Sequence, residues 1–162
     1  TGASRVEDIV NLLGHAARKL LECAAAPTEA PRAAPPSLLA VDGANATVSD
    51  TEADGLHLTE LACAADRPLL GTLAIIGALS KQASAFDRCA PRGDAAILHW
   101  SFEGGRPQDI TVRGASSKKV DACLVAALNK IRAPFDARCG AVLHVGDEKG
   151  AREAHARLPT GE

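Results

Sequence analysis

Five cysteines and five histidines are the residues of this 162-residue chain whose chemistry could define a site. The cysteines form no Cys-x-x-Cys motif and no tight group with histidine, so we do not expect a structural zinc site. Cys139 and His144 lie five positions apart on one extended segment, which places their side chains on opposite faces and argues against a thiolate with its base. His99 and His144 also fall on predicted strands and could be neighbours across a sheet.

These patterns predict no catalytic residue, no metal ligand and no cofactor. The alternative left open is a secreted metal-binding protein or a hydrolase that uses His99 and His144. A clustering of these two histidines with an acidic residue would favour that alternative.

Composition excludes some classes of function. Hydrophobic residues make up 46% of the chain, but there are only three Phe, one Trp, and no Tyr or Met, so the core must consist of small and aliphatic side chains. The net charge of −2, with Lys118-Lys119 as the strongest basic cluster, argues against binding of nucleic acid. No apolar run reaches the ~18 residues of a membrane span. No signal peptide is present, so an exported protein would begin at Thr1 as a mature or excised fragment.

The second half of the chain alternates between strand and helix patterns. Side chains alternate between two sides in 95–102, and Ile110 and Val112 alternate with Thr111 and Arg113 in 109–114, as in two strands. The Gly-Gly of 103–106, which lies between them, is typical of a hairpin turn. Apolar residues then recur at helical spacing in 120–131, with Ser116 or Ser117 as the cap and Pro134 as the terminator. A last strand is predicted at 140–145.

This order resembles a known family. The order begins with a helix ending at Cys89, followed by the strand Ile97-Leu98-His99-Trp100-Ser101-Phe102, a glycine turn and the strand Ile110-Thr111-Val112. A helix containing Val120-Asp121-Ala122-Cys123-Leu124 then precedes Pro134-Phe135. This order is similar to a TonB C-terminal domain of the AgmX/PglI type. That type occurs in myxobacterial gliding-motility and energy-transduction proteins. The resemblance covers residues 75–145 and implies an α+β fold with two helices on a small antiparallel sheet. The chain departs from the family in having Pro134-Phe135 rather than Phe-Pro, and in its additional Cys139.

The first half suggests a degenerate second unit. A capping box at Ser4-Arg5-Val6-Glu7 opens a predicted helix that ends near Cys23, and a Pro-rich loop follows at 24–36. Strands are expected at 37–42 and 46–50, whereas 56–65 suits either strand or helix. The expected organisation is a helix and degenerate TonB-C-like unit in 1–70, a TonB-C-like unit in 71–147, and a charged, solvated tail in 148–162.

An internal repeat would determine how the cysteines pair in disulfides. Aligning 60–65 with 120–125 matches Cys63 to Cys123, and the helix ending at Cys23 then corresponds to the one ending at Cys89. The repeat predicts Cys23–Cys63 and Cys89–Cys123 disulfides with Cys139 free. Disulfides would place the protein in the periplasm or another oxidising compartment, whereas five buried thiols would suit the cytosol.

Without a catalytic constellation, function is expected from surfaces. An antiparallel sheet with an exposed edge can accept a strand from another protein. We expect this partner-binding edge on the last strand, at Ala141, Val142, Leu143, His144 and Val145. The resemblance then implies a non-enzymatic periplasmic interaction module of a bacterial cell-envelope or motility complex. The remaining alternative is a purely structural scaffold domain stabilised by disulfides.

Overall fold

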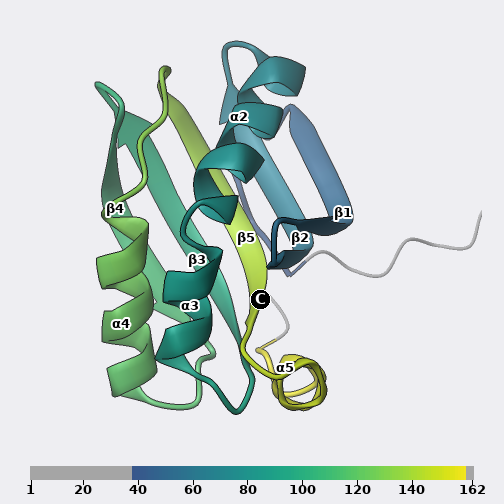
Figure 1. The fold of residues 1–162 in the computed structure, drawn as a ribbon. Helices are drawn as coiled ribbons and strands as arrows, with labels where there is room; N and C mark the ends of the chain where they lie inside the picture. Colours follow the sequence, from purple (N-terminus) through teal and green to yellow (C-terminus); the bar gives the residue numbers. More distant parts are fainter. Residues whose placement is uncertain (1–37, 160–162) are drawn as a thin grey trace, which may run out of the picture. The chain divides into compact units, whose positions relative to one another are not determined.

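The computed structural model describes residues 38–159. The predicted helix of 4–23 and the Pro-rich loop of 24–36 lie outside the described residues, as does Cys23. The described elements, shown in Figure 1, follow this order along the chain: β1 (Ala46–Ala53), β2 (Leu56–Ala65), α2 (Pro68–Ser80), α3 (Ala83–Cys89), β3 (Asp94–Glu103), β4 (Arg106–Arg113), α4 (Lys118–Leu128), β5 (Ala137–Val145) and α5 (Glu148–His155).

The strands form a five-stranded sheet in the order β1-β2-β5-β3-β4. Every neighbouring pair is antiparallel, which confirms the predicted antiparallel α+β class. The last strand in the sequence, β5, is the central strand, because it pairs with β2 on one side and β3 on the other. The sheet is continuous across the expected boundary between residues 70 and 71, which falls inside α2.

The β3–β4 hairpin and α4 confirm the predictions made for the second half. Gly104 and Gly105 have φ angles of 54° and 77° at the turn, a conformation that glycine adopts without steric cost. Ser117 is the N-cap of α4, and its hydroxyl oxygen accepts a hydrogen bond from the amide of Val120 at 3.3 Å. Local sequence signals are therefore sufficient for these elements.

The first half differs from the prediction. Residues 38–42 are not a strand, and β1 is paired instead with β2 through a turn in which Asp54 and Gly55 have φ angles of 48° and 81°. The ambiguous segment 56–65 is therefore a strand, whose apolar residues face the larger core on both sides of an irregularity between Leu58 and Glu60. The predicted repeat aligns 60–65, which lies in β2, with 120–125, which lies in α4, so the aligned segments differ in secondary structure.

Apolar side chains fill the space on both faces of the sheet. The larger core lies between the sheet and α2, α3 and α4, which pass in front of the sheet in Figure 1. We call this side the helix face; its fully buried side chains include Leu58, Leu61, Leu98, Leu124 and Leu143. On the opposite side, the α5 face, a smaller core joins Leu39, Ala62, Ala95, Ile97, Val142, Ala154 and Leu158.

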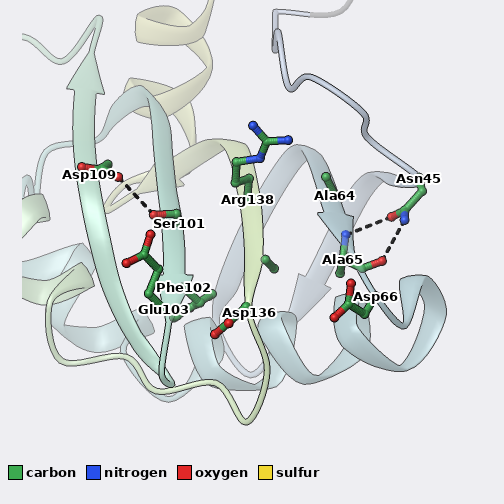
Figure 2. Close-up of a pocket in the computed structure, with 11 residues that line it drawn as sticks. Asn45, Ala64, Ala65, Asp66, Ser101, Phe102, Glu103, Asp109, Asp136 and Arg138 are labelled. Atoms are coloured by element: carbon green, nitrogen blue, oxygen red, sulfur yellow. Dashed lines mark hydrogen bonds between the residues drawn. The ribbon is translucent and has the colours of Figure 1, made fainter.

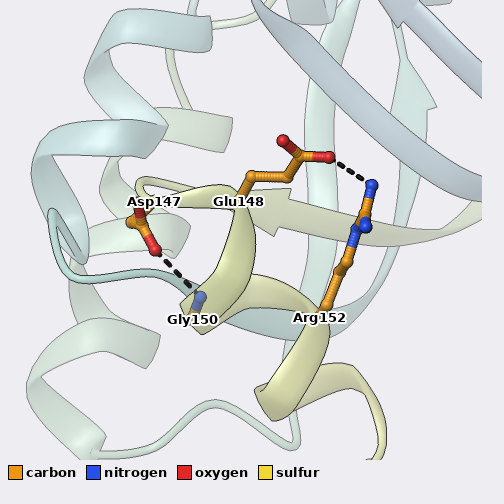
Figure 3. Close-up of polar contacts among 4 residues, drawn as sticks. All are labelled: Asp147, Glu148, Gly150 and Arg152. Carbon is orange, nitrogen blue, oxygen red and sulfur yellow. Dashed lines mark hydrogen bonds and ion pairs between the residues drawn. The ribbon is translucent and has the colours of Figure 1, made fainter.

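The predicted charged tail contains the helix α5, and part of it is buried. Ala154 and Leu158 are only 4% and 7% exposed because they pack on the α5 face, so the tail is not simply solvated. Figure 3 shows its first turn, where the Asp147 carboxylate accepts a hydrogen bond from the Gly150 amide at 3.0 Å. Arg152 and Glu148 form an exposed i,i+4 ion pair, which contributes little to stability.

Candidate functional site

The predicted partner-binding edge is not an edge. Ala141, Val142, Leu143, His144 and Val145 belong to the central strand β5, and each is at most 8% exposed. Their backbone groups are occupied by the ladders to β2 and β3. The prediction was wrong because strand order depends on tertiary pairing, and the last strand of the chain inserts between two hairpins.

Within residues 38–159, the outer strands of the sheet are β1 and β4. β4 carries two features that discourage pairing with another strand. The first is Pro107, which has no amide hydrogen to donate. The second is a bulge of β4 near Asp109, whose φ angle is 50°, where the register between β3 and β4 shifts between His99 and Ser101. Such features are common protections of exposed sheet edges.

β1 lacks these protections. Its eight residues contain no proline and no lysine or arginine, and the pairs from Ala46↔Cys63 to Ala53↔Leu56 keep equal residue counts on both strands. Asp50, with a φ angle of 46°, is the local irregularity. In the described part of the chain, no strand pairs with the outer side of β1. This strand is therefore the more accessible template for strand addition.

Exposed leucines lie on α2, the helix that contacts both β1 and β2. Leu69, Leu70 and Leu73 are 72%, 66% and 58% exposed, whereas Ile75 and Leu79 of the same helix are buried against the sheet. Three large apolar side chains on adjacent turns form a contiguous patch of the kind that marks interaction sites. The sequence contains a signal for it, because α2 is apolar on every side, but the sequence analysis did not single out these residues.

The orientation of α2 follows from Gly71. A β-carbon added at Gly71 would lie 3.4 Å from the ring of Phe135 and 3.5 Å from Cβ of Ala65, so this side of the helix faces the end of β2 and the segment that leads into β5. Leu69 and Leu73 are each two residues from Gly71, or about 200° around a helix. They therefore lie on the side turned away from Phe135 and from the end of β2.

The disulfides confirm one prediction and correct the other. Cys89 and Cys123 are joined as predicted and link α3 to α4, with Cα atoms 5.6 Å apart. Cys63 is joined to Cys139 rather than to Cys23, and Cys139 is not free. The physical reason is register: Cys63 and Cys139 are directly opposed on β2 and β5, with Cα atoms 4.2 Å apart and both side chains on the helix face.

The histidines form a group that the sequence analysis did not foresee. His99 is paired with Gly140 and His144 with Ala95, so four residue positions, about 13 Å along a strand, separate the two. The pair required by the metal-binding alternative is therefore not formed. His144 instead contacts His57 of β2, with ring centroids 4.7 Å apart, and its Nε2 lies 3.0 Å from Nδ1 of His155 of α5.

The environment of His144 disfavours its protonated form. Burial lowers the pKa of His144 to about 4, with further lowering by His57, His155 and Arg152, whereas Asp50 acts in the opposite direction. Its Nδ1 is buried without a hydrogen-bond partner within the described residues. Because an unsatisfied N–H donor would be costly there, we assign the proton to Nε2, which donates to His155. Burial also lowers the pKa of His99, and the nearby Arg113 adds to this effect.

A hollow with a volume of about 650 Å³ lies where β2 and β3 end and β5 begins (Figure 2). Its rim carries the acidic residues Asp66, Glu103, Asp109 and Asp136 together with Arg138. Several of its polar groups support the fold. Asn45 exchanges two hydrogen bonds with the backbone of Ala65, at 2.7 and 3.1 Å, and Asp136 accepts one from the amide of Gly104 at 2.9 Å.

Neither metal coordination nor a membrane span is indicated by the described residues. Between 38 and 159, no group of three or more His, Cys, Asp or Glu side chains is arranged to hold a metal ion. No single helix in this range is long and apolar enough to cross a membrane; α2 and α3 reach the required length and composition only together, and a bend of 55° separates them.

Comparisons with protein-family models, with curated proteins and with solved structures found no match for this chain. The function of this chain is therefore inferred from its own surfaces.

Proposed function

We propose that this chain is a non-enzymatic protein-interaction module that binds a partner by adding a strand of that partner to β1. The proposal is carried by the outer side of β1, a strand without proline or positive charge that keeps its register with β2 at the edge of an antiparallel sheet. Exposed backbone N–H and C=O groups on such a strand supply hydrogen bonds to any extended segment that lies beside it.

The two disulfides support an exported, oxidising location such as the periplasm. They tie the centre of the sheet to β2 and join α3 to α4, so the strands behind β1 form a stiff support. The resemblance of residues 75–145 to TonB C-terminal domains supports a role in a cell-envelope or motility complex, because those domains connect envelope machines to partner proteins.

Site-specific photo-crosslinking in cells tests this function. Thr47 of β1 and Thr111 of β4 are both exposed threonines on outer strands, so a photoreactive phenylalanine analogue at each position makes a matched pair. We expect a discrete crosslinked protein with the analogue at position 47 and none at position 111. Crosslinks from position 111 alone, or from neither position in cells that make the full complex, would contradict the proposal.

A further inference from the structure

The surface formed by the outer side of β1 and by Leu69, Leu70 and Leu73 of α2 is called here the β1–α2 surface. We propose that it receives an extended segment of a partner protein in which apolar residues alternate with Lys or Arg. This inference depends on the proposed strand addition and specifies the chemistry of the added strand.

The helix-face side of the added strand meets apolar groups. Val48 and Ala53 point to this side, because both pack against the larger core. Next to them, α2 lies over β1 and β2, with Leu69 and Leu73 on the side turned away from the end of β2. Asp50 interrupts the alternation of β1, so Val48 and Ala53 lie on the same side although they are five residues apart. Side chains of an added strand that lie opposite either residue would be on this side, next to α2. Apolar residues at those positions would cover leucine surface that water now contacts.

The opposite side of the added strand meets negative charge. Glu52 is paired in register with His57, and His57 with His144, whose ring contacts α5, so Glu52 lies on the α5 face. Asp50, Glu52 and Asp54 are exposed, and the sequence from 46 to 55 contains no Lys or Arg. Cross-strand pairs of opposite charge stabilise a sheet, whereas like charges destabilise it, so Lys or Arg is favoured on this side of the partner.

Short peptides test the chemistry of the partner directly. The probe is a fluorescent eight-residue peptide of alternating Leu and Lys, compared with one of alternating Leu and Glu, and binding to the full oxidised chain is measured by anisotropy. We expect the Leu-Lys peptide to bind at least ten times more tightly than the Leu-Glu peptide. Equal binding of the two peptides would overturn the inference about charge.

Variants locate the binding surface. The double substitution Leu69→Ser with Leu73→Ser should weaken binding of the Leu-Lys peptide at least tenfold. Glu52→Lys should weaken it several-fold and improve binding of the Leu-Glu peptide. Glu103→Lys, an equivalent charge reversal at the exposed turn of the β3–β4 hairpin, is the matched control and should change neither. Unchanged affinity in the double leucine variant would overturn the role of α2.

A further pair of peptides separates this inference from the proposed function. N-methylation of every second amide removes the donors on one side of an extended peptide, so only one of the two registers should abolish binding if the peptide adds to an edge. Equal effects of the two registers would contradict strand addition itself. Crosslinks from position 47 in cells, together with no preference for Leu-Lys peptides, would leave strand addition standing and overturn the proposed partner chemistry.

Discussion

Acidification should weaken the protein through the histidine group at the junction of β2, β5 and α5. In the folded chain the pKa of His144 is lowered from 6.5 to about 4, because the ring is buried between His57 and His155. The unfolded chain therefore binds a proton at this position first as the pH falls. The stabilisation is fully present above pH 6.5 and is lost progressively between pH 6.5 and about 4.

The expected loss is worked from the two pKa values. At about 1.4 kcal/mol per pKa unit, the difference between 6.5 and about 4 corresponds to about 3 kcal/mol as an upper limit.

Urea unfolding followed by the fluorescence of Trp100, the only tryptophan in the chain, measures this loss at pH 7 and pH 4.5. His144→Gln cannot be protonated, and its amide can still donate to His155, so it is the matched variant. We expect the decrease in unfolding free energy between the two pH values to be about 2 kcal/mol smaller in the variant than in the natural chain. Equal decreases, or an NMR titration of His144 near pH 6.5, would refute this explanation.

Three variants test the contacts that hold the sheet and its covering elements. Replacing Cys63 and Cys139 together with Ala should lower the unfolding free energy by about 4 kcal/mol in the chain-entropy model, and peptide mapping of the natural chain without reductant should find these two residues linked. Asp94→Asn should cost about 2–3 kcal/mol in urea unfolding, because the buried carboxylate accepts hydrogen bonds from both the amide and the hydroxyl of Ser116, at 2.9 and 2.7 Å. Gly150→Ala should lower the melting temperature and speed amide exchange in α5, because the added methyl group would overlap the backbone near Arg92. An unchanged melting temperature would contradict the close packing of α5.

The sequence was informative where structure depends on neighbours in the chain. The β3–β4 hairpin has its Gly-Gly turn, and α4 has Ser117 as its cap, and both elements formed as predicted. Residues 56–65 could not be assigned, because a strand that packs on one face and a short apolar helix share the same composition.

The sequence was uninformative where structure depends on distant pairing. Nothing local to residues 137–145 indicates that this strand inserts between β2 and β3, so the predicted edge was wrong. The same pairing opposes Cys63 and Cys139, which a repeat-based alignment could not anticipate. The histidine group likewise requires β2, β5 and α5 to meet, so His57 and His155 had no visible link to His144 in the sequence.

The resemblance to TonB C-terminal domains remains a prediction about family. The structure confirms the antiparallel α+β class that it implied. The partner-binding surface, in contrast, had to be placed from the observed strand order and from the exposed leucines of α2.

Hydrogen exchange of the backbone amides, with and without the partner captured by crosslinking, tests the account most directly. If a partner strand adds to β1, about half of the amides in residues 46–53 should become protected on binding, because alternate amides of an edge strand point outward. Amides of β4, residues 106–113, should exchange as before. Protection confined to β4, or binding that leaves the exchange of β1 unchanged, would contradict the assignment of β1 as the partner-binding edge.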